Sequence, residues 1–234
     1  AHFFSSALYQ LRRDRRSAYH HANEVIELSG EHGLIMYEAM ARVIAGWAIA
    51  EENQEEALQQ IRKGLVALEV TSTLLVRPHF LALFAETLAS SGQTAQALRA
   101  VDESIELIGR NNESYYKAEL YRLKGELLFK VATGQNLFQR VSPGAMVIPT
   151  NATEIERSFN YSIEIAQSQK ADSWLLRTAV SLARMYLCCG RAGKAQALLK
   201  PIYDRFTEGF ATPDLLDAKE LLERVRTVQF PRSA

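Results

Sequence analysis

The feature of this sequence that most constrains the fold is an internal repeat. Four segments share a spacing in which a first residue is followed four positions later by an apolar residue; these first residues are Ala57, Ala97, Ile155 and Ala195. The first two lie 40 residues apart, as do the last two, and the middle gap is 58 residues. An insertion of 18 residues therefore restores one period throughout. A repeat of this length is typical of stacked helical pairs.

A second amphipathic stretch precedes these segments. Apolar or small residues recur there at i, i+3, i+4 and i+7, the spacing of one helical face. The clearest sets are Ala41, Ile44, Ala45, Ala48; Leu81, Phe84, Ala85, Leu88; and Ala179, Leu182, Ala183, Tyr186. Two antiparallel helices approach closely only where side chains are small, so we expect pairs such as Ala45 facing Ala57. HEAT and armadillo arrays have similar periods, but the paired small residues favour the tetratricopeptide pattern.

The sequence therefore predicts an all-α fold, a right-handed α-α superhelix of about five tetratricopeptide-type hairpins and a C-terminal capping helix. We expect one domain over 1–234. Helices are expected at about 2–13, 15–31, 34–51, 54–70, 75–91, 94–109, 114–132, 152–168, 172–189, 192–206 and 213–228. The last of these has clear start signals, because Thr212 can cap the helix and Pro213 suits its first position.

The insertion falls at 133–150, within the fourth hairpin. Pro143, Gly144 and Pro149 oppose regular structure there. One interpretation is a surface loop of variable length. The other is a flap that covers a groove or meets a partner, because the segment is unusually apolar for a solvated loop. The candidate flap residues are Phe138, Val141, Met146, Val147 and Ile148.

Composition and charge exclude several classes of function. Lysine plus arginine equals aspartate plus glutamate, 27 against 27, which argues against a general nucleic-acid binder. No stretch approaches the ~20 apolar residues of a membrane span, and no signal peptide precedes the first arginines. The two cysteines, Cys188 and Cys189, are too few for a disulfide framework or a zinc site. A cytoplasmic protein fits these features best.

Catalytic signatures are absent from the sequence. GRAGKA at 190–195 resembles a phosphate-binding loop, but its spacing is short, the Ser or Thr is missing, and it lies at a predicted helix–helix turn. The adjacent His20 and His21 point ~100° apart on a helix and cannot share a metal as an i, i+4 pair would. We therefore expect a non-catalytic chain without cofactor or metal.

If the hairpins stack as proposed, their first helices line the concave side. Positions −6, −3, +1 and +5 from each small residue would then face outward, and the charged or histidine residues among them are Arg42, His79, Glu86, Glu119, Arg122, Glu126, Lys130, Arg177 and Arg184. One interpretation is a solvated face of mixed charge. The other is an interaction groove in which Arg122, Arg177 and Arg184 hold carboxylates of a peptide or an adjoining domain.

Several segments resemble the C-terminal helical-repeat region of large bacterial signalling ATPases, often fused to class III adenylate or guanylate cyclase domains. They are GWAIAEENQEEALQQIRKGL at 46–65, RPHFLALFAETL at 77–88, KAELYRLKGELLF at 117–129, DSWLLRTAVSLARMY at 172–186 and YDRFTEGFATPDLLDAKELLE at 203–223. The resemblance implies a cytoplasmic parent with an ATPase module and an output domain upstream. The start at Ala1 without methionine favours a piece of a longer polypeptide, although methionine removal before alanine is an alternative.

These expectations lead to two candidate functions. The first is a regulatory scaffold that binds a protein or peptide, or the parent's own ATPase or cyclase domains. The second is a sensor that holds a small-molecule effector in its groove, as in helical-repeat domains of ATP-dependent regulators. The sequence does not indicate the oligomeric state.

Overall fold

The computed structural model describes residues 1–70, 76–111, 114–137 and 147–229. Its secondary structure over these ranges is eleven α-helices without a strand. Each of the eleven helices lies in one of the expected ranges, so the predicted all-α class is confirmed. The chain divides into two compact units, Ala1–Tyr116 and Lys117–Ala234. One continuous domain over 1–234 stays a prediction.

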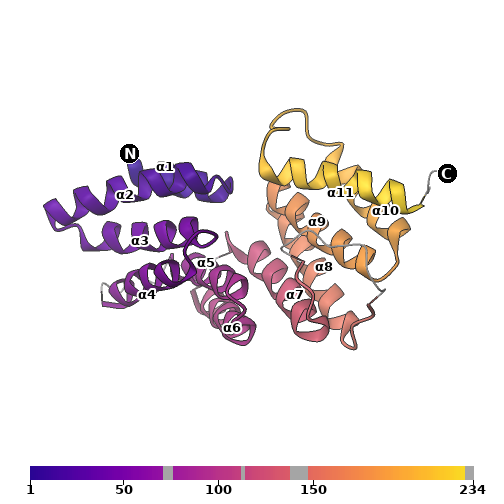
Figure 1. The fold of residues 1–234 in the computed structure, drawn as a ribbon, viewed down its shortest axis with the longest axis horizontal. Coiled ribbons are helices and arrows are strands. Elements are labelled where there is room, and N and C mark those ends of the chain that lie inside the picture. Colours follow the sequence, from indigo (N-terminus) through magenta and orange to yellow (C-terminus); the bar gives the residue numbers. More distant parts are fainter. Residues whose placement is uncertain (71–75, 112–113, 138–146, 230–234) are drawn as a thin grey trace. The chain divides into compact units, whose positions relative to one another are not determined.

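The first unit is a series of helices in which neighbours along the chain pack side by side (Figure 1). Its helices are α1 (His2–Leu11), α2 (Arg15–His32), α3 (Ile35–Ile49), α4 (Gln54–Val70), α5 (Arg77–Ser90) and α6 (Thr94–Asn111). Helices α3 and α4 form one hairpin and α5 and α6 another, and α5 packs against both helices of the preceding hairpin. The core of this unit contains Trp47, Ile61 and Phe80.

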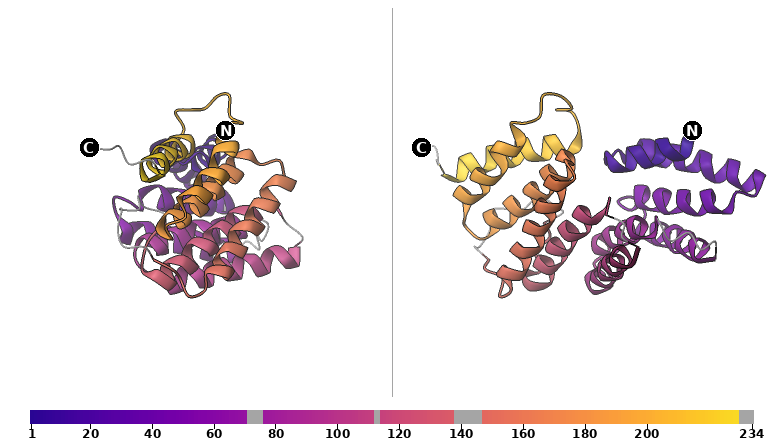
Figure 2. Two further views of the ribbon diagram at one scale, coloured as in Figure 1. Left: turned by 90° about the vertical axis from the view of Figure 1, so that its right-hand side faces the viewer. Right: turned by 180° about the vertical axis from the view of Figure 1, so that it is seen from behind.

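The second unit repeats this arrangement with longer connections. It contains α7 (Lys117–Thr133), α8 (Ala152–Ser168), α9 (Asp172–Cys188), α10 (Ala192–Tyr203) and α11 (Pro213–Gln229). Helices α7 and α8 pair, as do α9 and α10, and α11 lies along α9 and α10 (Figure 2). The predicted cap helix is therefore present, and its apolar residues Leu215, Ala218, Leu222 and Val225 are buried.

Small residues lie where the helices of a hairpin approach most closely. Ala45 and Ala57 are buried, as the sequence pattern required. Two glycines bring α3 and α4 still closer: a Cβ atom on Gly46 would lie 2.6 Å from the carbonyl oxygen of Ala57. A Cβ atom on Gly64 would lie 2.5 Å from the carbonyl oxygen of Ala39. The backbones of this hairpin therefore touch at two points where even alanine does not fit.

We expect Gly64→Ala to lower the free energy of unfolding by about 1–3 kcal/mol, because the added methyl group meets the backbone of α3 and forces the helices apart. Urea denaturation measures this change. The matched control is Gly109→Ala in α6, where an added Cβ meets nothing within 4 Å. The control should be neutral or stabilising by up to about 1 kcal/mol, because alanine is the better helix former. Equal behaviour of the two variants would contradict the close approach.

Candidate functional site

Polar side chains form matching rows on helices of the second unit. On α7, Glu119, Arg122, Glu126 and Lys130 follow one another at steps of three or four residues and so share a helical face. On α9, Arg177, Ser181 and Arg184 share a face in the same way, and α11 contributes Asp214 and Asp217 from its first turns. Three separate helices therefore supply the groups of one candidate site.

The centre of the site is a chain of ion pairs. Within α7, Arg122 lies between two carboxylates, with Nη2 2.6 Å from Glu119 Oε1 and Nη1 2.7 Å from Glu126 Oε1. From α9, Arg177 places Nη1 3.2 Å from the same Glu119 oxygen and Nη2 2.7 Å from Asp214 Oδ2. Arg177 Nε also donates to both Asp214 oxygens at 3.2 Å. We call Glu119, Arg122, Glu126, Arg177 and Asp214 the buried ion network.

Nearly all of this network is shielded from water. Glu119 is 0 % exposed and Glu126 1 %, while Arg122 and Arg177 are buried as well. A buried charge is tolerated only when it is paired and hydrogen-bonded. The hydroxyl group of Ser181 donates one such bond to Glu126. Each ion in the network therefore depends on its neighbours.

The pairing decides the ionisation of the network. Burial by itself would raise the pKa of Glu119, but the charges of Arg122 and Arg177 and their hydrogen bonds lower this pKa to about 2. Burial would lower the pKa of Arg177, but Glu119 and Asp214 raise it above its ordinary value. Both groups are therefore ionised at neutral pH.

A second arginine extends the contact between α9 and α11. Arg184 Nη2 lies 3.3 Å from Asp217 Oδ2. Since Asp217 follows Asp214 by one helical turn, two arginines of α9 hold two aspartates of α11. Arg184 Nη1 also donates to the carbonyl oxygen of Leu137, where the insertion begins, at 3.1 Å. The pairs thus fix the start of the cap helix on α9.

The other three predicted site residues belong to the first unit. Each has a polar partner there: Arg42 Nη2 lies 2.8 Å from Glu38 Oε1, His79 Nε2 lies 2.8 Å from Gln10 Oε1, and Trp47 Nε1 donates to Glu86 Oε2 at 2.7 Å. These contacts connect helices of the first unit. They do not form a single cluster.

The exposure of the predicted site residues differs from the expectation of an outward-facing row. Five are buried, namely His79, Glu119, Arg122, Glu126 and Arg177, and four are half-buried, namely Arg42, Glu86, Lys130 and Arg184. The reason is that neighbouring helices of the same unit cover these positions and supply countercharges. The arginines expected to hold a partner's carboxylates hold carboxylates of their own chain. Partner binding at these nine residues stays a prediction.

Sequence reasoning missed Ser181, Asp214 and Asp217 as members of this site. Asp214 was interpreted only as a favourable charge at the start of a helix. The available signal was a match of spacing, since Asp214 and Asp217 are one turn apart and Arg177 and Arg184 two turns apart. That signal becomes readable only when α11 is known to lie along α9.

The described ends of the insertion are both fastened to α9. Besides the bond from Arg184 to Leu137, the backbone N–H of Val147 donates to the carbonyl oxygen of Cys188 at 3.0 Å. Leu137 is buried, Val147 is half-buried and Ile148 is 68 % exposed. The other candidate flap residues, Phe138, Val141 and Met146, lie outside the described residues. The flap therefore stays a prediction.

A hollow of about 780 Å³ lies on the surface formed by α7 and α8. The rings of Tyr121 and Tyr161 meet edge to face at 4.6 Å on its wall. Lys124, Arg157 and Glu164 contribute charges to the lining. The hollow thus combines aromatic and polar groups of both signs in a space of the size that holds small ligands.

Other chemistry has little support in the part of the chain that the structure describes. That part holds no cluster of three or more histidine, cysteine, aspartate or glutamate residues suited to a metal ion. Cys188 and Cys189 are buried and not joined in a disulfide. Burial, together with the neighbouring Cys189, raises the pKa of Cys188 to about 11, and burial raises the pKa of Cys189. Thiols of this kind are poor nucleophiles at neutral pH.

Among the described helices, none combines the length and the apolar character that crossing a bilayer requires.

Comparison with known proteins shows a likeness of fold without a likeness of sequence. No family model and no curated protein matches the chain. Among solved structures, a Rap protein complexed with competence and sporulation factor superposes with a TM-score of 0.62 at 11% identity. The match covers 97% of this chain and 62% of the Rap chain, so this chain spans less than two thirds of that protein. The likeness shows a tetratricopeptide-like helical-repeat fold and confirms the predicted fold class.

The ionisation of Glu119 predicts a specific loss of stability in acid. Its pKa is about 2 in the folded protein against an ordinary value of 4.5. The stabilisation is therefore present above pH 4.5 and is lost as the pH falls toward 2, by about 3 kcal/mol in total. Glu119→Gln should cost roughly 3–5 kcal/mol at pH 7, because Arg122 and Arg177 lose their shared partner.

Urea denaturation of the wild type and this variant between pH 7 and pH 3 measures both effects. The gap in unfolding free energy should narrow steadily below pH 4.5. Glu106→Gln is the control, since Glu106 is exposed on α6 and lies 3.7 Å from Arg110. Its gap to the wild type should be small at every pH. A constant gap for Glu119→Gln would show that the network is not ionised as described.

Proposed function

We propose that this chain is a non-catalytic protein-interaction module that regulates a larger bacterial signalling ATPase or nucleotide cyclase. The observation that carries the proposal is the way charged groups are used in the second unit. Glu119, Arg122, Arg177 and Asp214 neutralise one another inside the helices. They stiffen a framework and perform no chemistry. A rigid framework binds a partner without first losing conformational freedom.

The likeness of fold supports the same reading. The Rap protein was solved with a signalling factor bound, so a helical-repeat framework of this kind can receive a signalling molecule. The segments that resemble the repeat region of signalling ATPases support a cytoplasmic parent with ATPase and cyclase modules. The partner in this proposal is a protein or peptide, or those modules themselves.

Half-buried members of the predicted site are the groups that a partner reaches first. In the second unit they are Lys130 and Arg184, on the C-terminal halves of α7 and α9. Burial lowers the pKa of Lys130, so an incoming carboxylate would find a cation poorly solvated by water. Arg184 already accepts a carboxylate, that of Asp217, and a partner's acid would replace it. The buried ion network then holds both helices in place beneath the contact.

A second candidate function is an effector sensor, which the hollow on α7 and α8 favours. Its volume of about 780 Å³ lies within the range of small-molecule sites. Tyr121 and Tyr161 would cover the flat face of a ligand, and Arg157 and Lys124 would take an anionic group. In this alternative the bound molecule, not a protein, transmits the signal.

The test of the proposed function is binding to ATPase or cyclase domains encoded in the same or the adjacent reading frame. We expect a complex detectable by calorimetry and a change in the partner's nucleotide turnover when the chain is added. Lys130→Glu combined with Arg184→Gln should weaken the complex at least about tenfold. Arg110→Glu on α6, an exposed charge change in the first unit, is the control and should leave affinity unchanged.

A thermal-shift screen with metabolites separates the two candidates. A rise of several degrees with one chemical class, lost in Tyr161→Ala, would favour the sensor. Absence of any complex together with such a rise would overturn the interaction proposal.

A further inference from the structure

Helix α1 is amphipathic in the reverse sense. Its buried side chains are polar, with Ser6 0 % and Gln10 2 % exposed. Its most exposed large side chains are apolar, with Phe4 71 % and Leu8 54 % exposed. A helix at the surface of a protein normally shows the opposite pattern. The outer face of α1 therefore has the composition of a helix face that packs against something.

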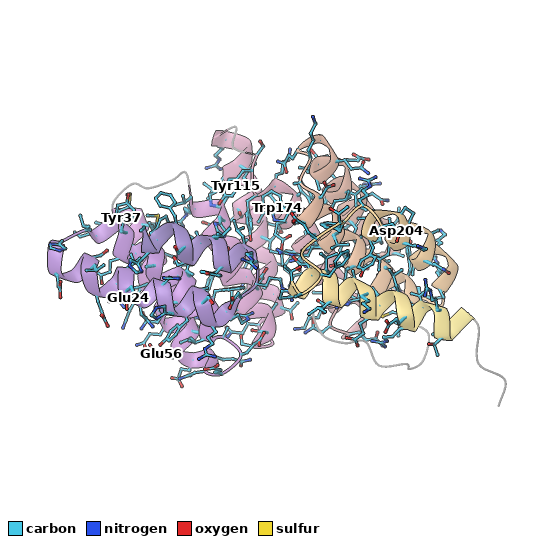
Figure 3. The ribbon with its side chains drawn as sticks, turned by 90° about the horizontal axis from the view of Figure 1, so that it is seen from above. Glu24, Tyr37, Glu56, Tyr115, Trp174 and Asp204 are labelled. Carbon is cyan, nitrogen blue, oxygen red and sulfur yellow. The ribbon has the colours of Figure 1, made fainter. Side chains whose placement is uncertain are left out.

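Specific hydrogen bonds hold α1 in this orientation. The hydroxyl group of Ser6 donates to the carbonyl oxygen of Phe3 at 2.7 Å. Gln10 Oε1 lies 2.8 Å from Nε2 of His79, a buried residue of α5. Phe3 itself packs inward, where its ring meets Tyr37 of α3 at 5.5 Å (Figure 3 labels Tyr37). Rotating α1 to bury its outer apolar residues would break these bonds and bury fewer atoms of Phe3.

The apolar stripe runs directly into positive charge. Phe4, Leu8 and Arg12 are spaced four residues apart, and Arg12 keeps helical backbone angles at the end of α1. Arg13 and Arg16 are exposed at the same end of the helix. Asp14 is the only acidic residue among positions 1–23, and it caps α2 by accepting from Ser17. We call Phe4, Leu8, Arg12, Arg13 and Arg16 the α1 face.

We propose that the α1 face docks an amphipathic helix of a protein partner, whose apolar stripe ends in acidic residues. A stripe one side chain wide matches the groove between the ridges of another helix. The arginines at one end provide charge complementarity and set the direction of the partner. With α1 at the edge of its unit (Figure 1), a partner helix would continue the side-by-side packing of the first unit.

Two other occupants fit the α1 face less well. A membrane surface is bound by longer helices with a broad apolar face, whereas α1 has ten residues and two exposed large apolar side chains. A second copy of α1 lying antiparallel would bring the arginines beside a helix N-terminus, where the partial charge is also positive. Neither occupant uses the arginines and the apolar stripe together.

The experiment uses the full chain and two short labelled peptides, designed as helices with one leucine stripe. One peptide carries glutamates in its first turn, and the other carries lysines at the same positions. We expect fluorescence anisotropy to show binding of the glutamate peptide and at least about tenfold weaker binding of the lysine peptide. Phe4→Ser with Leu8→Ser, and separately Arg12→Glu, should each weaken binding of the glutamate peptide at least about tenfold.

The matched control is Val66→Ser with Val70→Ser on α4. These two residues are 61 % and 81 % exposed and also four positions apart, but no arginine cluster follows them. The control should bind the glutamate peptide like the wild type. Equal weakening in the control, or equal binding of both peptides, would overturn the proposal. Arg12→Glu keeps the test valid if the double serine variant fails to fold, because Arg12 is exposed.

Two further measurements distinguish the other occupants. Sedimentation that shows a dimer of the wild type and a monomer of the Phe4→Ser, Leu8→Ser variant would assign the α1 face to a second copy. Binding to vesicles of phosphatidylcholine and phosphatidylserine, lost in the same variant, would assign it to a membrane. Either result would overturn the protein-helix proposal.

Discussion

The second unit depends on one guanidinium group. Arg177 of α9 binds Glu119 of α7 on one side and Asp214 of α11 on the other, so a single buried cation joins three helices. Such a cation has no acceptable alternative to these partners once water is excluded. The position of the cap helix is thus determined by charge as well as by its apolar residues, which by themselves would tolerate sliding along α9. The same group explains why a face that should be wet is dry.

The helices and the contacts within hairpins were predictable because their signals are local. Apolar periodicity shows where a helix lies and which face it buries, and small residues such as Ala45 and Ala57 show where two helices approach. The site was not predictable in the same way. Whether Glu119 faces solvent or an arginine depends on which helix lies over it, and that information is spread over almost 100 residues between Glu119 and Asp214. Periodicity identified the row of charges and could not show what covers it.

The two units use polar residues for opposite ends. In the second unit, buried charges satisfy one another and leave a closed interior. In the first unit, buried Ser6 and Gln10 hold α1 so that apolar side chains remain outside. An exposed apolar residue is ordinary by itself, but a polar residue inside opposite an apolar residue outside implies that the orientation of the helix is imposed. The first unit therefore offers a surface that its own folding does not need, whereas the second consumes most of its charged groups in folding.

The adjacent cysteines at the end of α9 have a practical consequence. Cys188 and Cys189 are the only cysteines of the chain, both are buried, and burial raises both pKa values. Alkylating reagents attack thiolates, so the folded protein should resist them while an opened α9–α10 turn reacts at the ordinary rate of a free thiol. The pair is therefore a native chemical clock for local opening, and a cysteine engineered elsewhere would accept a spectroscopic label without competition from the wild-type thiols.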